Sequence, residues 1–289
     1  MTIIKAFCIA LSTYSRIPMP KFEWKGREIK LAVIFFPVIG VIVGLAEYLL
    51  YMLFKIVDLP VFPMTVMCCV IPVLITRGIH LNGYMHTLDA LSFKGSHEKK
   101  LEIMRDLHVG GYSVIRMFLF VGGFASAVYL LLYYSFDHSL ISYMQSDFLI
   151  GGAAIPPTVA PYTIEEIVYV WAMSFVLSRL MSAISIVTFP FTDKSGQMYA
   201  FSGRDESGKI NKTAFICLVV EEIIVLAAML FINPVAGGVL IATSLLAFIF
   251  YWISCKKGFG GFTGDLTGWF LCLSEFWMTI AAAVLAIIM

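Results

Sequence analysis

Charged side chains are scarce in this chain of 289 residues, of which 13% are Asp, Glu, Lys or Arg and 60% are hydrophobic. A water-soluble domain carries about a quarter charged residues, so this composition excludes a soluble globular protein and also a disordered one. The sequence has neither a heptad pattern nor a regular glycine repeat, which excludes coiled coils and collagen. We therefore predict a single integral membrane domain over residues 1–289.

The chain also lacks an excess of either charge. Its 20 Lys and Arg and 19 Asp and Glu give a formal net charge of +1, so nothing in the charge points to a nucleic-acid partner. Its 6 cysteines show no C-x-x-C spacing and most lie in apolar runs, which favours buried thiols over a disulfide or zinc framework. The apolar residues 3–13 have no small-residue cleavage pattern, so we expect a short membrane-edge helix there instead of a signal peptide.

Long apolar runs, by contrast, are abundant. A helix needs about 20 apolar residues to cross a hydrocarbon core of about 30 Å. We predict an all-α, polytopic integral membrane protein, because about seven stretches meet this requirement. The predicted spans are approximately Leu31–Phe54, Val61–Ile79, Tyr112–Tyr134, Ile167–Pro190, Ala214–Ile232, Val239–Ser254 and Trp269–Met289.

Lys and Arg lie almost entirely on one side of these predicted spans. They cluster before the first span and after the second, fourth and sixth. Positively charged connections stay in the cytoplasm, so we predict a protein of the prokaryotic cytoplasmic (inner) membrane with these connections inside. The residues concerned are Lys21, Lys25, Arg27, Lys30, Lys94, Lys99, Lys100, Arg105, Lys194, Arg204, Lys209, Lys212, Lys256 and Lys257.

The first polar group follows the second predicted span and contains His80, Asn82, His86 and Asp89. If this segment is helical, its spacing places Asn82, His86 and Asp89 on one face. Such a face suits a divalent ion, or a phosphate held through one. A polar helix end solvated at the membrane surface would have the same composition, and these residues alone leave both interpretations open.

The second polar group contains Lys99, Lys100, Glu102, Arg105 and Asp106. Glu102 and Asp106 are like charges one helical turn apart, so they repel each other unless a cation lies beside them. Arg105, in a salt-bridged surface turn, would supply that cation. A magnesium ion would also supply it, because carboxylates bridged by magnesium commonly hold a pyrophosphate.

The third polar group opens the last predicted span and includes Gly260, Gly261, Thr263, Gly264 and Asp265. Glycines let a backbone approach a ligand closely, and a following helix N-terminus favours anions. Asp265 adds a carboxylate that can bind a metal. The segment matches neither the P-loop nor the dinucleotide fingerprint, and an interfacial glycine turn is the structural alternative.

Two charged residues, Arg179 and Glu275, lie well inside predicted spans. A charge at that depth is costly and usually faces a protein interior or a wet cavity. Each is therefore a functional candidate, with mutual pairing as the structural alternative. The neighbours Glu221 and Glu222 suggest no role beyond polar contacts between helices.

The polar groups belong to longer motifs, which are His80-Leu81-x-Gly83 with Thr87-x-Asp89, Lys99-Lys100-Leu101-Glu102-Ile103 with Asp106 and Gly110, Ser178-Arg179 with Phe189-Pro190, Gly260-Gly261-x-Thr263-Gly264-Asp265, and Leu11-Ser12-x-x-Ser15-Arg16-Ile17-Pro18. With these motifs nearly the whole chain resembles the cobalamin synthase family, the adenosylcobinamide-GDP ribazoletransferases. The resemblance implies an integral membrane enzyme that joins adenosylcobinamide-GDP to α-ribazole or its 5′-phosphate and releases GMP. It also implies a requirement for magnesium, with manganese as an alternative ion.

The resemblance further implies roles in the attack of a ribazole hydroxyl on a pyrophosphate. The catalytic residues would be Asp89, Glu102, Asp106 and Asp265. The substrate-binding residues would be His80, Lys99, Lys100, Arg105, Arg179, Gly260, Gly261, Thr263 and Gly264. The metal ligands would be Asn82, His86, Asp89, Glu102, Asp106 and Asp265.

The chain departs from the family pattern in the first motif. The family's usual run is H-L-D-G-x-x-D-T-x-D, and here Asn82 and His86 replace aspartates. Losing these negative charges weakens a site for a hard ion such as magnesium, so we expect a weakened, altered or inactive member. The alternatives are an inactive corrinoid-binding or transport homologue and a CDP-alcohol phosphotransferase-type enzyme, although the D-G-x-x-A-R signature of the latter is absent. A homo-oligomer is compatible with the sequence.

Overall fold

The computed structural model describes residues 2–20, 26–106, 108–147, 163–194, 197–205 and 207–289, without the side chains of residues 137–147 and 197. Within these ranges the chain forms helices and no strand, so the predicted all-α class is confirmed. Lys21, Lys25 and residues 148–162 of the predicted outer connection lie outside the described residues. The helices are α1 (Thr2–Tyr14), α2 (Gly26–Ala32), α3 (Phe36–Val57), α4 (Val61–Ile75), α5 (Ile79–Ser92), α6 (His97–Arg105), α7 (Gly111–Asp147), α8 (Ile164–Thr188), α9 (Gln197–Phe201), α10 (Lys212–Ile232), α11 (Pro234–Ile253) and α12 (Gly264–Ile288), with a 3₁₀ turn at Val33–Phe35 and a π-helical turn at Ser254–Gly258.

The chain is a multi-pass membrane protein. Its described part has 6 helices long and apolar enough to cross a membrane, and up to 7 spans if a bent pair of shorter helices is included. The outer faces suit lipid tails, since Phe118 and Leu119 on α7 are 67% and 70% exposed. α1 is apolar but too short to span, as predicted. The candidate spans are Gly26–Val57, Gly111–Phe136, Ile164–Thr188, Lys212–Ile232, Pro234–Gly258 and Gly264–Ile288.

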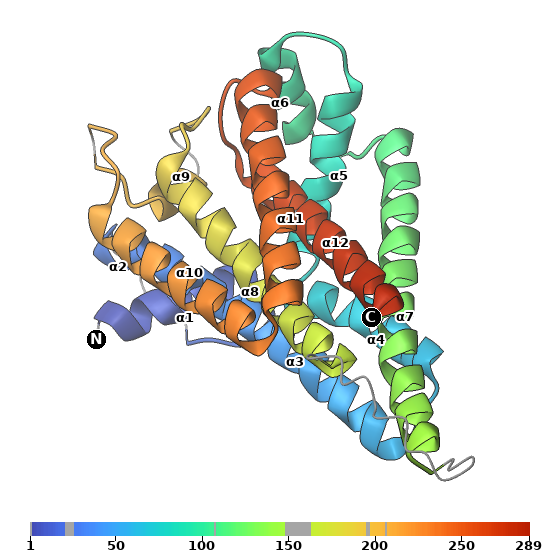
Figure 1. Ribbon diagram of the computed structural model, residues 1–289. Coiled ribbons are helices and arrows are strands. Elements are labelled where there is room, and N and C mark those ends of the chain that lie inside the picture. The colour runs from blue at the N-terminus through green and yellow to red at the C-terminus, as the bar shows by residue number, and fades with distance from the viewer. Residues whose placement is uncertain (1, 21–25, 107, 148–162, 195–196, 206) are drawn as a thin grey trace.

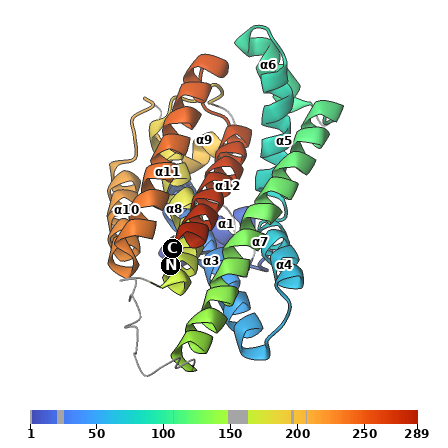
Figure 2. The same cartoon turned by 45° about the vertical axis from the view of Figure 1, so that its right-hand side comes forward.

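Helix α8 forms the centre of the bundle, with α3, α10, α11 and α12 packed around it (Figure 1 and Figure 2). α3 approaches α8 through Gly40 and Gly44, which form a G-x-x-x-G motif. A Cβ atom at Gly44 would lie 2.2 Å from the carbonyl oxygen of Ala172. The two helices are therefore in backbone contact, and this contact requires glycine.

Replacing Gly44 by Val is expected to destabilise the protein by about 1–3 kcal/mol, the usual cost of overpacking a close contact. The added side chain would collide with the Ala172 backbone. Gly238→Val on α11 is the matched control, because a Cβ atom there meets nothing within 4 Å. Thermal unfolding in detergent should give a lower midpoint for Gly44→Val only, and equal midpoints would contradict the close α3–α8 contact.

The second predicted span is a bent pair of helices, because α4 stops at Ile75 and meets α5 at an angle of 89°. Between them Arg77 and Gly78 adopt left-handed backbone conformations, with φ angles of 56° and 70°, and such residues end a helix. The Ile75 carbonyl at the break accepts a hydrogen bond from the Arg16 backbone N–H at 2.7 Å. This corrects the prediction of one span over residues 61–79, and the first polar group lies on a separate helix.

The last span begins earlier than predicted. We expected it to start at Trp269, whereas α12 starts at Gly264 with Thr263 as its N-cap. The Thr263 hydroxyl accepts a hydrogen bond from the backbone N–H of Leu266 at 3.4 Å. Asp265 therefore belongs to the first turn of α12, where the helix dipole favours a negative charge.

Candidate active site

Helices α5 and α12 cross at two glycines, and this crossing brings the first and third polar groups together. A Cβ atom at Gly83 would lie 2.8 Å from the Asp265 carbonyl oxygen. A Cβ atom at Gly268 would lie 2.8 Å from the His80 carbonyl oxygen. Any larger residue would push the helices apart, so the glycines hold the first turn of α12 against α5.

His86 lies among the acidic residues of this crossing. It is 9% exposed and interacts electrostatically with both Asp106 and Asp265. Its Nδ1 atom is buried and has no hydrogen-bond partner among the described residues. Asp265 is half-buried, and its carboxylate likewise forms no hydrogen bond within the described part of the chain. Both side chains therefore keep hydrogen-bonding capacity that the described residues do not use.

Asp106 follows α6 and directs its carboxylate at His108. The backbone N–H of His108 donates to Asp106 Oδ1 at 3.0 Å, and the imidazole Nδ1 lies 3.1 Å from the same oxygen. These hydrogen bonds, together with a smaller effect of His86, lower the pKa of Asp106 below its usual value. The Asp106 carboxylate is therefore charged at neutral pH and adds a negative charge near His86.

Asp89 connects the end of α5 to the start of α7. Its Oδ2 atom accepts a hydrogen bond from the backbone N–H of Gly110 at 2.5 Å and another from the Ser113 hydroxyl at 3.1 Å. A carboxylate in this position satisfies free N–H groups at the N-terminus of α7. The prediction that the first polar group is helical is confirmed, but its side chains meet different surroundings, because Asp89 bonds to α7 and Asn82 is exposed.

The charged side chains of α6 are paired across its surface. Lys99 Nζ lies 2.8 Å from Glu102 Oε2, so the cation that balances Glu102 is Lys99 and not the predicted Arg105. Arg105 instead pairs with Asp193, in the segment after α8, at 3.1 Å. All these side chains are more than two-fifths exposed, from 43% for Asp193 to 68% for Arg105, so each ion pair contributes little stability.

The glycine-rich segment before α12 is packed between α6 and the segment after α8. Gly260 has a positive φ of 71°, and a Cβ atom there would lie 2.9 Å from His97 Nδ1. A Cβ atom at Gly261 would lie 2.9 Å from the Pro190 carbonyl oxygen, which also accepts a hydrogen bond from the Phe262 backbone N–H at 2.8 Å. These glycines therefore pack closely against other parts of the chain, as expected for an interfacial glycine turn. Contacts between them and a substrate stay a prediction.

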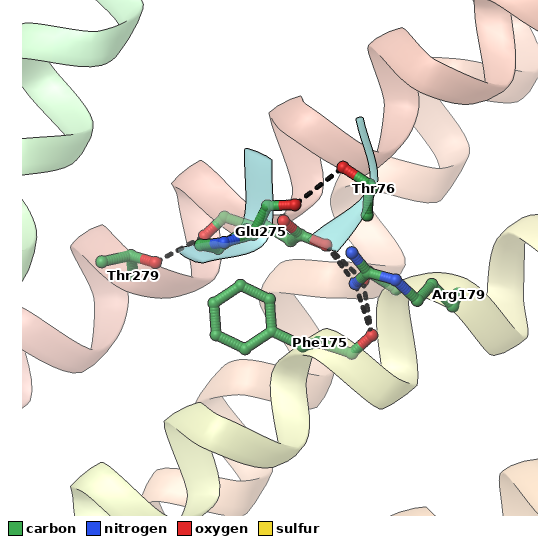
Figure 3. A network of polar contacts seen from close by, with 7 residues as sticks. Thr76, Phe175, Arg179, Glu275 and Thr279 are labelled. Carbon is green, nitrogen blue, oxygen red and sulfur yellow. Dashed lines mark hydrogen bonds and ion pairs between the residues drawn. The ribbon is translucent and has the colours of Figure 1, made fainter. Parts of the chain in front are cut away.

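Arg179 and Glu275 form an ion pair in the interior of the bundle (Figure 3). Arg179 Nη1 lies 2.6 Å from Glu275 Oε1 and donates to the Phe175 carbonyl at 2.7 Å, and the Ser178 hydroxyl also donates to Glu275. Arg179 is 1% exposed. The mutual pairing considered as an alternative is thus present, and a contact between Arg179 and a substrate phosphate stays a prediction.

The residues predicted as metal ligands do not form a preformed metal centre. Among the described residues, no three His, Cys, Asp or Glu side chains group closely enough to hold an ion. His86 interacts electrostatically with Asp106 and with Asp265, whereas Asp89 is bonded to α7 and Glu102 to Lys99. The metal ligands and the requirement for magnesium therefore stay predictions.

Two charged residues that are important in the structure, Glu47 and Arg204, were not identified as candidates from the sequence. Glu47 on α3 is 0% exposed, and its carboxylate interacts with the thiol of Cys68 on α4. Its position inside an apolar run of the sequence would have been enough to identify it, because a charged residue within a membrane span is costly. Arg204, counted only as a cytoplasmic charge, donates to the carbonyls of Val187 and Phe189 at 3.0 and 2.6 Å and holds the C-terminal end of α8.

The chain is similar to known proteins along nearly its whole length. The family model described as Cobalamin-5-phosphate synthase matches residues 6–283. A relative from Lachnoclostridium phytofermentans, named adenosylcobinamide-GDP ribazoletransferase, is 30% identical over 284 residues, which cover 98% of this chain and 95% of that protein. Relatives of the same name from Clostridium perfringens (strain SM101 / Type A) and Desulfitobacterium hafniense (strain Y51) are 27% and 28% identical, covering 94% and 98% of both chains.

No solved structure matches the chain. The family match extends over almost the whole described bundle, from α1 to α12, and so includes every polar group of the candidate site. The chain therefore belongs to the cobalamin-5-phosphate synthase family.

Proposed function

We propose that this protein is an adenosylcobinamide-GDP ribazoletransferase, which joins adenosylcobinamide-GDP to α-ribazole or its 5′-phosphate and releases GMP. The observation that carries the proposal is the close contact of α5 with α12 through Gly83 and Gly268, which brings Asp265 into electrostatic interaction with His86, in a chain of this enzyme family. Relatives that match nearly the whole chain bear the name of this activity.

The reaction forms one phosphorus–oxygen bond and breaks another. The ribazole hydroxyl attacks the phosphorus attached to cobinamide, the bond to GMP breaks, and the hydroxyl loses its proton. Asp265 is suited to hold that hydroxyl and accept its proton, because its carboxylate is half-buried and no described residue bonds to it. His86, beside Asp265, would orient the carboxylate and the hydroxyl.

The basic side chains of α6 are suited to bind the substrate phosphates. Lys99 and Arg105 form exposed ion pairs with Glu102 and Asp193, and such pairs are weak enough to be exchanged for a phosphate. Lys100 lies over the ring of Phe259 at 5.9 Å, beside the glycine-rich segment. These cations lie in connections that we predict to be cytoplasmic, so we propose that the site faces the cytoplasm.

The requirement for magnesium stays a prediction, and restoring the missing acids tests it. The double substitution Asn82→Asp with His86→Asp adds two carboxylates to α5, one of them beside Asp106 and Asp265. We expect the apparent affinity for magnesium in turnover to rise by about tenfold or more, since ligand charge sets the affinity of such sites. Asn211→Asp, at the N-cap of α10, is the matched control. An unchanged magnesium dependence in the double variant would reject the idea that the departures weaken a metal site.

Release of GMP that depends on the acceptor tests the proposed function itself. The purified protein in nanodiscs is given adenosylcobinamide-GDP with and without α-ribazole, at several magnesium and manganese concentrations. We expect GMP only when both substrates are present. GMP at the same rate without α-ribazole would show hydrolysis, and no GMP under any condition would reject the transferase.

Corrinoid transport is a second candidate, because the bundle contains a broken span and buried charged residues. Both features are common in transporters, where they form binding sites near the middle of the membrane. Uptake of cobinamide into proteoliposomes, without any GMP release, would favour transport over the transferase.

A further inference from the structure

The crossing of α3 and α8 leaves a groove of about 400 Å³ on the outside of the bundle. Its floor is the backbone contact between Gly44 and Ala172, which both line it. Each wall is a helical stripe of residues four and three positions apart, so the side chains of a stripe lie on one face of their helix. The two stripes are Val41, Leu45 and Tyr48 on α3 and Tyr169, Met173 and Val176 on α8.

The groove has the shape and lining of a site for a hydrocarbon chain. Each stripe covers seven residue steps, which is about 10 Å along a helix. Val41 and Leu45 are 49% and 52% exposed, so the groove is open to the surrounding bilayer. No charged side chain is among its lining residues in the described part of the chain. A charged group would have to give up its water to enter, whereas an apolar chain would not.

One end of the groove is polar. The rings of Tyr48 and Tyr169 meet there edge to face, with their centroids 5.4 Å apart. The Tyr169 hydroxyl donates to Glu165 Oε2 at 3.4 Å, and Glu165 Oε1 forms an ion pair with Lys55 Nζ. The Tyr48 hydroxyl forms no hydrogen bond to a described residue. The apolar stripes therefore end at a free hydroxyl, a carboxylate and an ammonium group.

This polar end lies where the bundle meets a membrane surface. Lys55 is in the last turn of α3 and Glu165 is in the first turn of α8. Tyrosines are enriched at such depths, because their rings are apolar and their hydroxyls are polar. Figure 1 shows this end of α3 at the bottom of the bundle and α6 at its top. The groove therefore faces the leaflet opposite to the candidate active site.

The Lys55–Glu165 pair matches a head group with one charge of each sign. Its side chains are 36% and 32% exposed, and so exposed a pair is weak enough to be exchanged for other partners. Lys55 complements a lipid phosphate, and Glu165 complements a lipid ammonium group. A head group with only a negative charge would leave Glu165 beside it without a counter-charge.

We propose that this groove binds a phospholipid with an ethanolamine head group. One acyl chain lies between the two stripes, the Tyr48 hydroxyl donates to an ester carbonyl, and the head group exchanges charges with Lys55 and Glu165. The primary ammonium of ethanolamine donates hydrogen bonds to a carboxylate, whereas the trimethylammonium of choline has no N–H to donate. The site is separate from the candidate active site, so the proposal does not depend on the transferase reaction.

Lipid binding to the delipidated protein in detergent tests the head-group assignment. Native mass spectrometry compares phosphatidylethanolamine with phosphatidylcholine carrying the same acyl chains. We expect the parent to bind phosphatidylethanolamine about tenfold more tightly, the usual effect of a hydrogen bond between charged groups. Glu165→Gln should bind the two lipids equally. Glu98→Gln, at the exposed start of α6, is the matched control and should keep the preference.

Filling the groove tests the site of the acyl chain. Leu45→Trp should weaken the binding of both lipids by about tenfold or more. Leu53→Trp is the matched control, because Leu53 on the same helix is 51% exposed and does not line the groove. Val41→Trp fills the groove from a second position and guards against misfolding of the first variant.

Three results would overturn the proposal. They are equal binding of the two lipids by the parent, parent-level lipid binding in both groove variants, and no lipid binding by the parent at all. The same spectra report the oligomeric state. A parent dimer without bound lipid, which Leu45→Trp converts to a monomer, would show instead that the groove is an interface between two copies of this chain.

Discussion

Replacing Asp265 by Asn is expected to lower turnover by about 10²–10⁴-fold, the range that loss of an acid–base group produces. The amide keeps the size of the carboxylate but cannot accept the hydroxyl proton. Asp265 lies in the first turn of α12 and forms no hydrogen bond to a described residue, so the substitution should leave the fold intact.

The rate of GMP release and the thermal unfolding midpoint are measured on the same Asp265→Asn preparation. Asp205→Asn is the matched control, because Asp205 is exposed and its hydrogen bonds among the described residues lie within its own turn, to Ser207 and to the Lys209 backbone. Parent-level turnover in Asp265→Asn would remove Asp265 from the chemistry. Low turnover with a lowered midpoint would assign it a structural role instead.

Replacing Arg179 by Met is expected to destabilise the protein by about 3–5 kcal/mol, the usual cost of leaving one member of a buried ion pair without its partner. The Glu275 carboxylate, whose side chain is only 11% exposed, would lose its counter-charge and keep the hydrogen bond from the Ser178 hydroxyl. Unfolding in detergent measures the effect, and the decrease should be similar with or without substrates.

A double-mutant cycle distinguishes pairing from packing. Arg179→Met combined with Glu275→Gln removes both charges, so most of the lost stability should return. Lys55→Met is the control, because the Lys55–Glu165 pair is 36% and 32% exposed and a surface pair contributes only about 0–1 kcal/mol. If Arg179→Met costs no more than Lys55→Met, the buried pair is not an important element of the bundle.

Composition and apolar run length were sufficient to predict the membrane class, the helical fold and most of the spans. The break between α4 and α5 was not predicted, because Arg77 adopts a left-handed backbone although it is not glycine. The backbone at the break is held locally by the hydrogen bond from the Gly78 N–H to the Val73 carbonyl, and also by a distant contact, from the Arg16 N–H to the Ile75 carbonyl. A local sequence pattern cannot contain this information.

Residue spacing likewise predicted one part of the candidate site and missed another. Helical spacing correctly placed Asn82, His86 and Asp89 on one helix, but it could not show what each side chain would meet. The bond from Asp89 to the start of α7 depends on how two helices pack. Glu102 pairs with Lys99, three residues earlier on the same helix, which spacing alone allows. Arg105 instead reaches Asp193, far away in sequence, and such a partner is decided by tertiary packing.

Formation of the corrinoid product by the parent protein tests the proposed transferase most directly. The protein in nanodiscs is incubated with adenosylcobinamide-GDP and α-ribazole, and the corrinoids and GMP are quantified by mass spectrometry. We predict that adenosylcobalamin and GMP accumulate in equal amounts and that neither forms with Asp265→Asn. Unchanged adenosylcobinamide-GDP, in a preparation that binds both substrates, would contradict the assignment of this chain as an active ribazoletransferase.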